Sequence, residues 1–298
     1  MRTDVYERIT AQIVADLEQG VRPWHKPWNA EHAAGRITRP LRSNGIPYRG
    51  INVLMLWAAA VGAGHAAPIW ITFKQAQELG GHVRKGERGS TVVYASTFSR
   101  TETDPDTGAE EERDIPFLKG YTVFNVEQVD GLPKHFYGKP ASRLDPVQRI
   151  ATAEAFFAAT GAIIRHGGNM AAYRAVDDVI LMPPFEAFRD AESYCATLAH
   201  EATHWTKHPD RLGRDLGRKR WGDEGYAMEE LVAELGAAFV CADLDLMPAT
   251  REEHASYIAS WLKVLKGDSR AIFTAAAHAQ RAADFLNGLQ PHETEAAA

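Results

Sequence analysis

Cysteine is scarce in this chain, with two residues, Cys195 and Cys241, among 298. Two cysteines cannot build the disulfide framework on which small secreted domains depend. Both lie in apolar surroundings typical of helices, so we interpret them as buried small hydrophobic residues and not as a redox pair. This usage fits a reducing compartment, and we expect a cytoplasmic protein.

Long hydrophobic runs are also missing. The longest, residues 51–63, contains Asn52 and is shorter than the roughly 20 residues that cross a bilayer. Residues 1–6 open an amphipathic helix and not the apolar core of a secretory signal. We therefore expect no membrane-spanning segment, no membrane partner and no signal peptide.

An overall excess of basic residues, which would favour nucleic-acid binding, is absent because the formal net charge is −6. The charge is unevenly distributed, however. Residues 1–100 hold thirteen Lys and Arg against seven Asp and Glu, whereas residues 101–298 hold twenty against 32. Such asymmetry between two halves indicates a different partner for each half.

The length leaves room for two domains of ordinary size. Residues 130–145 contain two prolines and two glycines, a composition typical of linkers. We expect the chain to divide into a first domain at 1–130, a linker at 131–145, a second domain at 146–290 and a disordered tail at 291–298.

Hydrophobic periodicity predicts an α+β fold. In the first domain, helices are expected at 3–20 and 51–62, and strands at 68–72, 90–98 and 118–129, with 101–114 as an exposed hairpin loop. The second domain is predicted to be mostly helical with a small sheet. Its expected elements are a strand ending at Met182 and helices at 146–161, 186–208, 226–244, 251–266 and 268–288.

Residues 198–205 carry the pattern H-E-x-x-H within one of these helices. His200 and His204 are four residues apart and therefore lie on one face, where both rings can bind one metal ion. Zinc lowers the pKa of bound water to about 7, and Glu201 is placed to act as the general base toward that water. The pattern indicates a zinc metallopeptidase, with Zn²⁺ or another divalent metal as cofactor. The alternative is a surface helix whose two histidines are merely solvated.

A catalytic zinc site needs a third protein ligand. Glu230 and Glu234 lie one turn apart on the helix predicted at 226–244, so one can bind metal while the other accepts the far ring N–H of a ligand histidine. We predict Glu230 as the ligand and Glu234 as the supporting carboxylate. Glu229 remains an alternative third ligand.

Tyr173 precedes the predicted strand of the second domain. An edge strand near the metal of a metallopeptidase can pair with an extended substrate. Tyr173 or His208 could stabilise an oxyanion, although packing for the first and helix capping for the second are commoner roles.

Aromatic residues of the first domain alternate with basic residues on proline-rich loops. Single-stranded nucleic acid is held by cationic grooves with rings on which bases stack. The alternative is that the tryptophans anchor the core and the arginines are solvated. The predicted contacts are Trp24, Lys26, Trp28, Arg39, Arg42, Asn44, Tyr48, Arg49, Asn52, Trp70, Arg84, Lys85 and Arg88.

Together these features resemble the ArdC family of plasmid antirestriction proteins. The start of the chain is also similar to primases carried by conjugative plasmids. The segments that carry the family resemblance are PWHKPWN (23–29), NGIPYRGIN (44–52), WITFKQAQELGGHVRKGERGSTVVY (70–94), LAHEATHWTKHPDRL (198–212) and YAMEELVAELGAAF (226–239).

The resemblance implies an N-terminal domain that binds single-stranded DNA and a C-terminal zincin-like metallopeptidase domain. It also implies protection of incoming plasmid DNA from host restriction during conjugation. The second half is similar, in addition, to proteases that remove proteins crosslinked to DNA. Two alternatives remain: a DNA-binding module with a structural or vestigial metal site, and a peptidase unrelated to DNA. The sequence does not identify the protein or peptide substrate.

Overall fold

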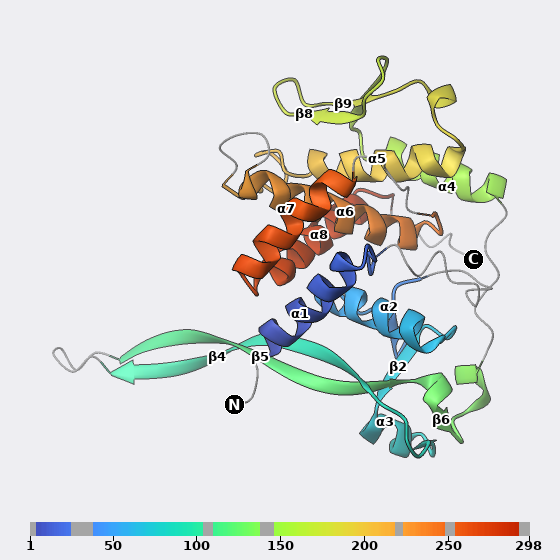
Figure 1. Cartoon of the computed structure of the whole chain (residues 1–298), viewed down its shortest axis with the longest axis vertical. Helices are drawn as coiled ribbons and strands as arrows, with labels where there is room; N and C mark the ends of the chain where they lie inside the picture. The colour runs from blue at the N-terminus through green and yellow to red at the C-terminus, as the bar shows by residue number, and fades with distance from the viewer. Residues whose placement is uncertain are drawn as a thin grey trace, which may run out of the picture.

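The computed structural model describes residues 4–24, 38–103, 110–137, 146–217, 223–247 and 254–291. It shows the predicted α+β fold: an N-terminal part of mixed helices and strands and a mostly helical C-terminal part with a small sheet (Figure 1). The predicted contacts Lys26 and Trp28, and residues 292–298 of the expected tail, lie outside the described residues.

The N-terminal part is built around a four-stranded sheet in the order β1-β2-β5-β4, beside a two-stranded sheet of β3 and β6. Local signals set its helix ends: Thr72 and Gln75 form a capping box at the start of α3, and Gly64 ends α2 in a left-handed conformation. The elements are α1 (Val5–Glu18), β1 (Leu41–Arg42), α2 (Ile51–Ala63), β2 (Ile69–Thr72), α3 (Phe73–Glu78), β3 (His82–Val83), β4 (Ser90–Thr103), β5 (Glu110–Asn125), η2 (Val126–Gln128), β6 (Val129–Asp130) and η3 (Lys134–Tyr137).

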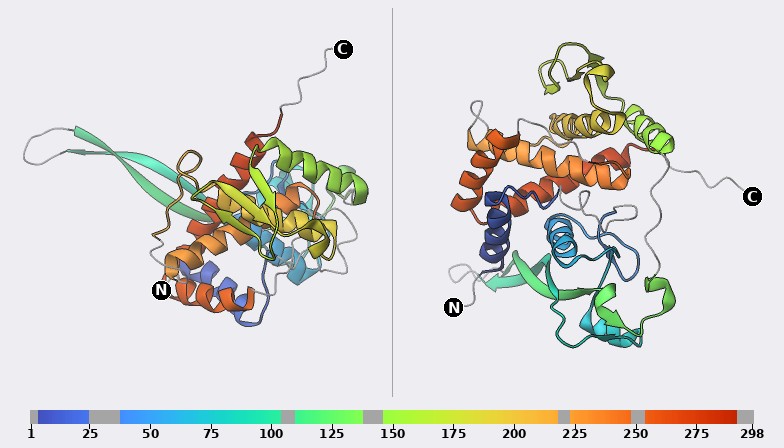
Figure 2. Two further views of the ribbon diagram at one scale, coloured as in Figure 1. Left: turned by 90° about the horizontal axis from the view of Figure 1, so that it is seen from above. Right: turned by 45° about the vertical axis from the view of Figure 1, so that its right-hand side comes forward.

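Strands β4 and β5 form a long twisted ribbon that projects from the body of the molecule (Figures 1 and 2). Their antiparallel register runs without interruption from the pair Ser90–Val123 to the pair Thr103–Glu110. Most of the segment predicted as a loop, 101–114, is therefore paired strand. Once the register is set near the body, each further pair adds backbone hydrogen bonds, which offset the weak strand propensity of the acidic residues.

The C-terminal part places a three-stranded sheet, in the order β7-β9-β8, over α5 (Figure 1). The strand expected to end at Met182 is β9 (Val179–Met182). It pairs with β8 (Ala172–Arg174), which the sequence patterns do not predict, and the two are joined by a turn where Asp178 has a positive φ of 52°. The elements are α4 (Pro146–Ala159), β7 (Ile163–His166), β8 (Ala172–Arg174), β9 (Val179–Met182), η4 (Phe185–Ala187), α5 (Ala191–Trp205), α6 (Glu224–Asp243), α7 (His254–Gly267) and α8 (Ala271–Gly288).

One hydrophobic core spans both parts of the chain. It contains Leu17 of α1 and Leu54 of α2 together with Leu198 of α5, Leu231 of α6 and Ile272 of α8. Helix α1 packs against α7 and α2 against α8, and α6 contacts α5, α7 and α8. The helix that carries the predicted acidic ligands is therefore fixed from several sides. None of the described helices combines the length and hydrophobicity needed to cross a bilayer.

Candidate metal centre

The predicted histidine pair lies on a helix that is buried along most of its length. Asp190 caps the start of α5 by accepting the Ser193 N–H at 2.7 Å, and every residue from Cys195 to Trp205 is buried. Helix α6 packs closely against it at Gly236, where an added Cβ would lie 2.5 Å from Thr203 Cγ2. This glycine lets the two helices approach closely beside the candidate site.

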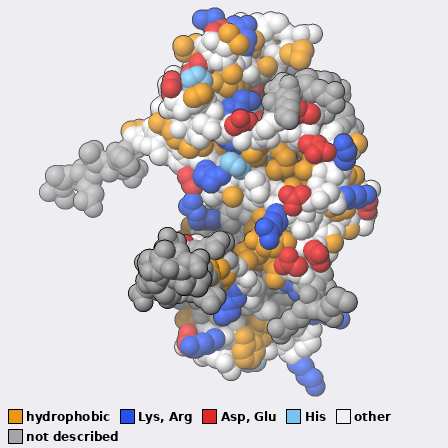
Figure 3. Space-filling view, turned by 90° about the vertical axis from the view of Figure 1, so that its left-hand side faces the viewer, with side chains coloured by type: hydrophobic (Ala, Val, Ile, Leu, Met, Phe, Trp, Pro, Cys, Tyr) orange, Lys and Arg blue, Asp and Glu red, His pale blue; other side chains and the backbone are white. Residues whose placement is uncertain are grey.

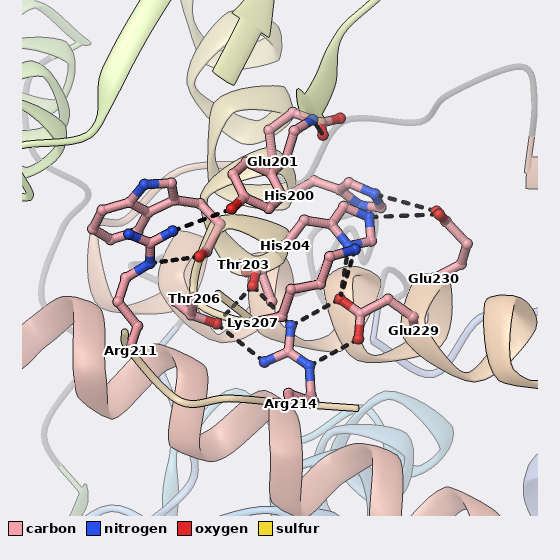
Figure 4. A network of polar contacts seen from close by, with 12 residues as sticks. His200, Glu201, Thr203, His204, Thr206, Lys207, Arg211, Arg214, Glu229 and Glu230 are labelled. Carbon is pink, nitrogen blue, oxygen red and sulfur yellow. Dashed lines mark hydrogen bonds and ion pairs between the residues drawn. The ribbon is translucent and has the colours of Figure 1, made fainter. Parts of the chain in front are cut away.

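Glu230 faces both histidine rings across this helix pair (Figure 4). Its two carboxylate oxygens lie 3.5 Å from His200 Nε2 and 3.5 Å from His204 Nε2. One nitrogen from each ring and one carboxylate oxygen all lie within 4.8 Å of one another. The three side chains converge in the way that a shared metal ion requires.

The opposite nitrogen of each ring faces another carboxylate. His204 Nδ1 lies 2.9 Å from Glu229 Oε1, and His200 Nδ1 lies 3.9 Å from Glu234 Oε1. At 2.9 Å the Glu229 carboxylate can accept the His204 Nδ1–H, which fixes the tautomer and orientation of that ring, and Glu234 places a second carboxylate near His200 at 3.9 Å. Of the two alternative third residues, Glu230 lies between the Nε2 atoms and Glu229 lies behind one ring.

Arg214 completes this arrangement, and the sequence patterns did not single it out. Its guanidinium is almost fully buried and donates two hydrogen bonds to Glu229, at 2.8 and 2.9 Å. It also donates to Thr206 Oγ1 at 3.1 Å and to the Thr203 carbonyl oxygen at 2.9 Å. A bidentate guanidinium holds a carboxylate in one orientation, so Arg214 fixes Glu229 against His204.

The charges of these groups depend on one another. Burial opposes ionisation of Glu229, but hydrogen bonds from Arg214 and His204 outweigh it and lower its pKa to about 2. Burial likewise opposes the charged form of His204, but Glu230 and Glu229 outweigh it and raise its pKa to about 9. Burial would raise the pKa of Glu230, but the neighbouring His204 and His200 outweigh it and lower that pKa. Ionised carboxylates around two imidazoles make a pocket that favours a cation.

Glu201 lies beside this cluster and faces the small sheet. Its Oε2 accepts the Tyr173 N–H at 2.8 Å. Tyr173 is on β8, an edge strand of its sheet, so this amide points away from β9 and toward the site. The edge of β8 and the Glu201 carboxylate therefore border the same space.

The side chain of Tyr173 is engaged elsewhere. Its hydroxyl donates to Asp178 at 2.8 Å and accepts from Arg211 at 3.2 Å. Burial and the Asp178 carboxylate raise the pKa of Tyr173 to about 12. Arg211 also stacks on Trp205 at 3.8 Å, which ties the β8–β9 turn to the end of α5. His208 Nδ1 accepts the Asp210 N–H at 3.2 Å, a local contact beyond the end of α5.

Four of the predicted nucleic-acid contacts are buried, which corrects the expectation that they face a bound strand. Trp24, Trp70, Tyr48 and Arg39 are each less than 9% exposed. Trp24 packs edge-on against Trp261, with ring centroids 6.0 Å apart. No ring enclosed in this way offers a face to a base.

Arg39 joins the two parts of the chain. It donates to Asp243 Oδ2 at 2.6 Å and to Gln280 Oε1 at 3.0 Å, and its guanidinium lies 5.1 Å from the Phe239 ring centroid. The same Gln280 oxygen accepts the Gly50 N–H. These contacts assign Arg39 to the internal interface.

Asn52 is partly buried and bonds both the N–H and the carbonyl oxygen of Val93, so its amide stabilises the edge of β4. Other predicted contacts are exposed, and two already have acidic partners: Arg49 pairs with Asp284, and Arg84 with Glu87. On the face shown in Figure 3, basic and acidic side chains are interspersed and form no continuous basic stripe. The exposed members of the predicted set are Arg42, Asn44, Arg49, Arg84, Lys85 and Arg88.

Comparison with known proteins adds independent information. A family described as the N-terminal domain of anti-restriction factor ArdC matches residues 3–124, and a family described as zincin-like metallopeptidase matches residues 151–278. The uncharacterized protein y4eC of Sinorhizobium fredii is 47% identical over 294 residues, which cover 97% of this chain and 93% of that protein. DNA primase TraC of Escherichia coli is 38% identical over 299 residues, but these are 94% of this chain and only 27% of the primase.

Two solved structures of the antirestriction protein ArdC from plasmid R388 share the fold. The metal-free structure superposes with a TM-score of 0.80 at 48% identity, covering 96% of this chain and 98% of that protein. The Mn(II)-bound structure has a TM-score of 0.80 at 45% identity, covering 97% and 99%.

Proposed function

Because this chain belongs to the ArdC family of antirestriction proteins, we propose that it protects incoming plasmid DNA from restriction by coupling single-stranded DNA binding to a metal-dependent peptidase centre. The observation that carries the peptidase assignment is the convergence of both histidine Nε2 atoms on Glu230, beside Glu201. The DNA-binding assignment is supported by the N-terminal family match and by the basic balance of residues 1–100.

The side chains present fit a divalent cation. His200, His204 and Glu230 supply two imidazole nitrogens and one carboxylate oxygen, a donor set that suits zinc and leaves a further position open. The R388 relative is known with Mn(II), so another divalent metal is compatible with the family. When bound, the cation would polarise a carbonyl group and lower the pKa of water. Glu229 and Glu234 would orient the two imidazoles from behind.

Glu201 is proposed as the general base. Its carboxylate takes a proton from the attacking water and later delivers it to the leaving amine. The Tyr173 N–H holds the Glu201 carboxylate beside the edge of β8. An extended peptide that adds to this edge would place its scissile bond next to Glu201.

DNA binding and proteolysis support each other in this proposal. A protein bound to the same strand would be present at a high effective concentration near the metal centre. The shared hydrophobic core and the Arg39 interface keep the two parts in one fixed arrangement. The substrate class is therefore proteins on or near single-stranded DNA.

The proposal is tested with wild type and Glu201→Gln side by side. Metal content, a single-strand gel shift, cleavage of a DNA-bound protein and protection of DNA from restriction are measured for each. We expect the variant to keep its metal and its DNA affinity and to lose proteolysis. Loss of DNA binding in Glu201→Gln would contradict the division of roles. If Glu201→Gln protected DNA from restriction as well as wild type does, protection would come from coating of the strand and not from proteolysis.

A further inference from the structure

Three large aromatic side chains on the β4–β5 ribbon are exposed to solvent. Tyr94 is 53% exposed, Phe117 36% and Tyr121 41%. Single exposed rings are common on protein surfaces, but a contiguous group of them often marks a site of interaction. We call these three residues, together with Lys119, the aromatic row.

The strand register places the aromatic row on one face of the ribbon. Tyr121 pairs with Val92, Lys119 with Tyr94 and Phe117 with Ser96. These pairs are two residues apart, and side chains at that spacing point to the same side of a strand.

The members of the row are also close to one another. The Tyr94 and Phe117 ring centroids lie 6.2 Å apart, and Lys119 Nζ lies 5.1 Å from the Tyr121 ring centroid. The row is therefore a continuous surface of rings with a cation beside them.

Where the ribbon leaves the body of the protein, its opposite face packs against α1 and the core. An added Cβ at Gly120 would lie 3.9 Å from Val5 of α1, and Arg8 of α1 donates to Thr91 at 3.2 Å. Leu118 packs against the main core. Gly120, Thr91 and Leu118 alternate with the residues of the aromatic row, so the row lies on the side away from α1.

The charge of the aromatic row suits a polyanion. Lys119 is exposed, and its ammonium lies over the Tyr121 ring, where it can pair with a phosphate next to a stacked base.

We propose that the aromatic row is the platform on which bases of single-stranded DNA stack, with Lys119 at the phosphates. Sequence-tolerant binding of single strands uses flat rings next to cations, which is the combination found here. This inference rests on the proposed DNA-binding function and identifies the surface that performs it. It replaces the buried rings of Trp24 and Trp70 in that role.

The test uses the full chain and a fluorescent oligothymidine in an anisotropy titration at fixed salt. Tyr94→Thr and Tyr121→Thr remove a ring but keep a residue that favours strands. Each should weaken binding by about 5- to 150-fold, which corresponds to roughly 1–3 kcal/mol per stacked base. Tyr94→Phe and Tyr121→Phe keep the ring and should bind within about twofold of wild type. Phe185→Ala, at an exposed ring of the C-terminal part, is the matched control and should leave affinity unchanged.

Lys119→Gln provides a second, independent readout. It should lower the slope of log affinity against log salt by about 0.7, the value for one phosphate contact with a single strand. Equal affinities for wild type and both threonine variants would overturn this inference and leave the proposed function standing. A wild-type chain that binds no single-stranded DNA would overturn both. Thermal unfolding of each variant shows whether a lost affinity reflects a lost fold.

Discussion

Replacing Arg214 should weaken metal binding although Arg214 does not reach the metal position. Arg214→Gln removes a guanidinium that is 1% exposed and makes two hydrogen bonds to Glu229. Loss of a group that orients a ligand through a second residue typically reduces metal affinity about 10- to 100-fold. Glu229 would then hold His204 less firmly.

The same change should lower stability. Removing one partner of a buried ion pair costs about 3–5 kcal/mol. Lys207 Nζ lies 3.7 Å from Glu229 and supplies part of the missing charge, so we expect the lower end, about 3 kcal/mol. Arg214→Lys keeps a charge but not the two parallel hydrogen bonds, so it should recover stability more fully than metal affinity.

The assay is a zinc titration against a competing chelator, with urea unfolding of the same preparations. Arg189→Gln is the matched control, because Arg189 is 79% exposed and pairs with Asp190 at the surface. Arg189→Gln should leave the zinc affinity and the free energy of unfolding within error of wild type. A folded Arg214→Gln variant that binds zinc as tightly as wild type would refute the positioning role of Arg214.

Three further predictions follow from the described contacts. Arg39→Met should lower the free energy of unfolding by about 1–3 kcal/mol, because it leaves the partly buried Asp243, which is 26% exposed, without its cation. The folded fraction should keep its affinity for single-stranded DNA, and a selective loss of that affinity would show that Arg39 contacts DNA. Gly236→Ala should cost about 1–3 kcal/mol and weaken zinc binding, since the new methyl group meets Thr203, and Thr203→Ala in the same chain should restore both; equal calorimetric stability of Gly236→Ala and wild type would contradict this. With chelator present, the stability due to Glu229 should be intact above pH 4.5, its ordinary pKa, and should be lost as pH falls toward 2, and Glu229→Gln should remove this acid limb from urea titrations.

The geometry of the candidate metal centre is largely predictable from the sequence because the information that sets it is local. Two histidines four residues apart must share a helix face, and acidic residues one turn apart must share another. Spacing alone does not decide whether Glu229 or Glu230 is the third ligand. Adjacent residues of a helix point about 100° apart, and the packing of α6 determines which of them faces the histidines. That packing depends on the close contact between Gly236 and Thr203, which no spacing pattern in the sequence predicts.

Other features depend on contacts between distant residues. Arg39 donates hydrogen bonds to Asp243 and Gln280, which follow it by more than 200 positions, and Trp24 packs against Trp261. Aromatic residues interleaved with basic residues form the same sequence pattern whether their side chains face solvent or the core. The sequence patterns do not predict the exposed aromatic row. Its residues alternate as in an ordinary strand, and only the pairing register of β4 with β5 shows that the rings lie on one face.

The most direct test of the central proposal is calorimetric zinc titration of wild type, Glu230→Gln and Glu229→Gln. Wild type should bind one zinc ion per chain, Glu230→Gln should lose the high-affinity site, and Glu229→Gln should retain the site with about 10- to 100-fold weaker binding. Wild-type affinity in Glu230→Gln, or a wild-type chain that takes up no zinc, would contradict the assignment of a metal to His200, His204 and Glu230.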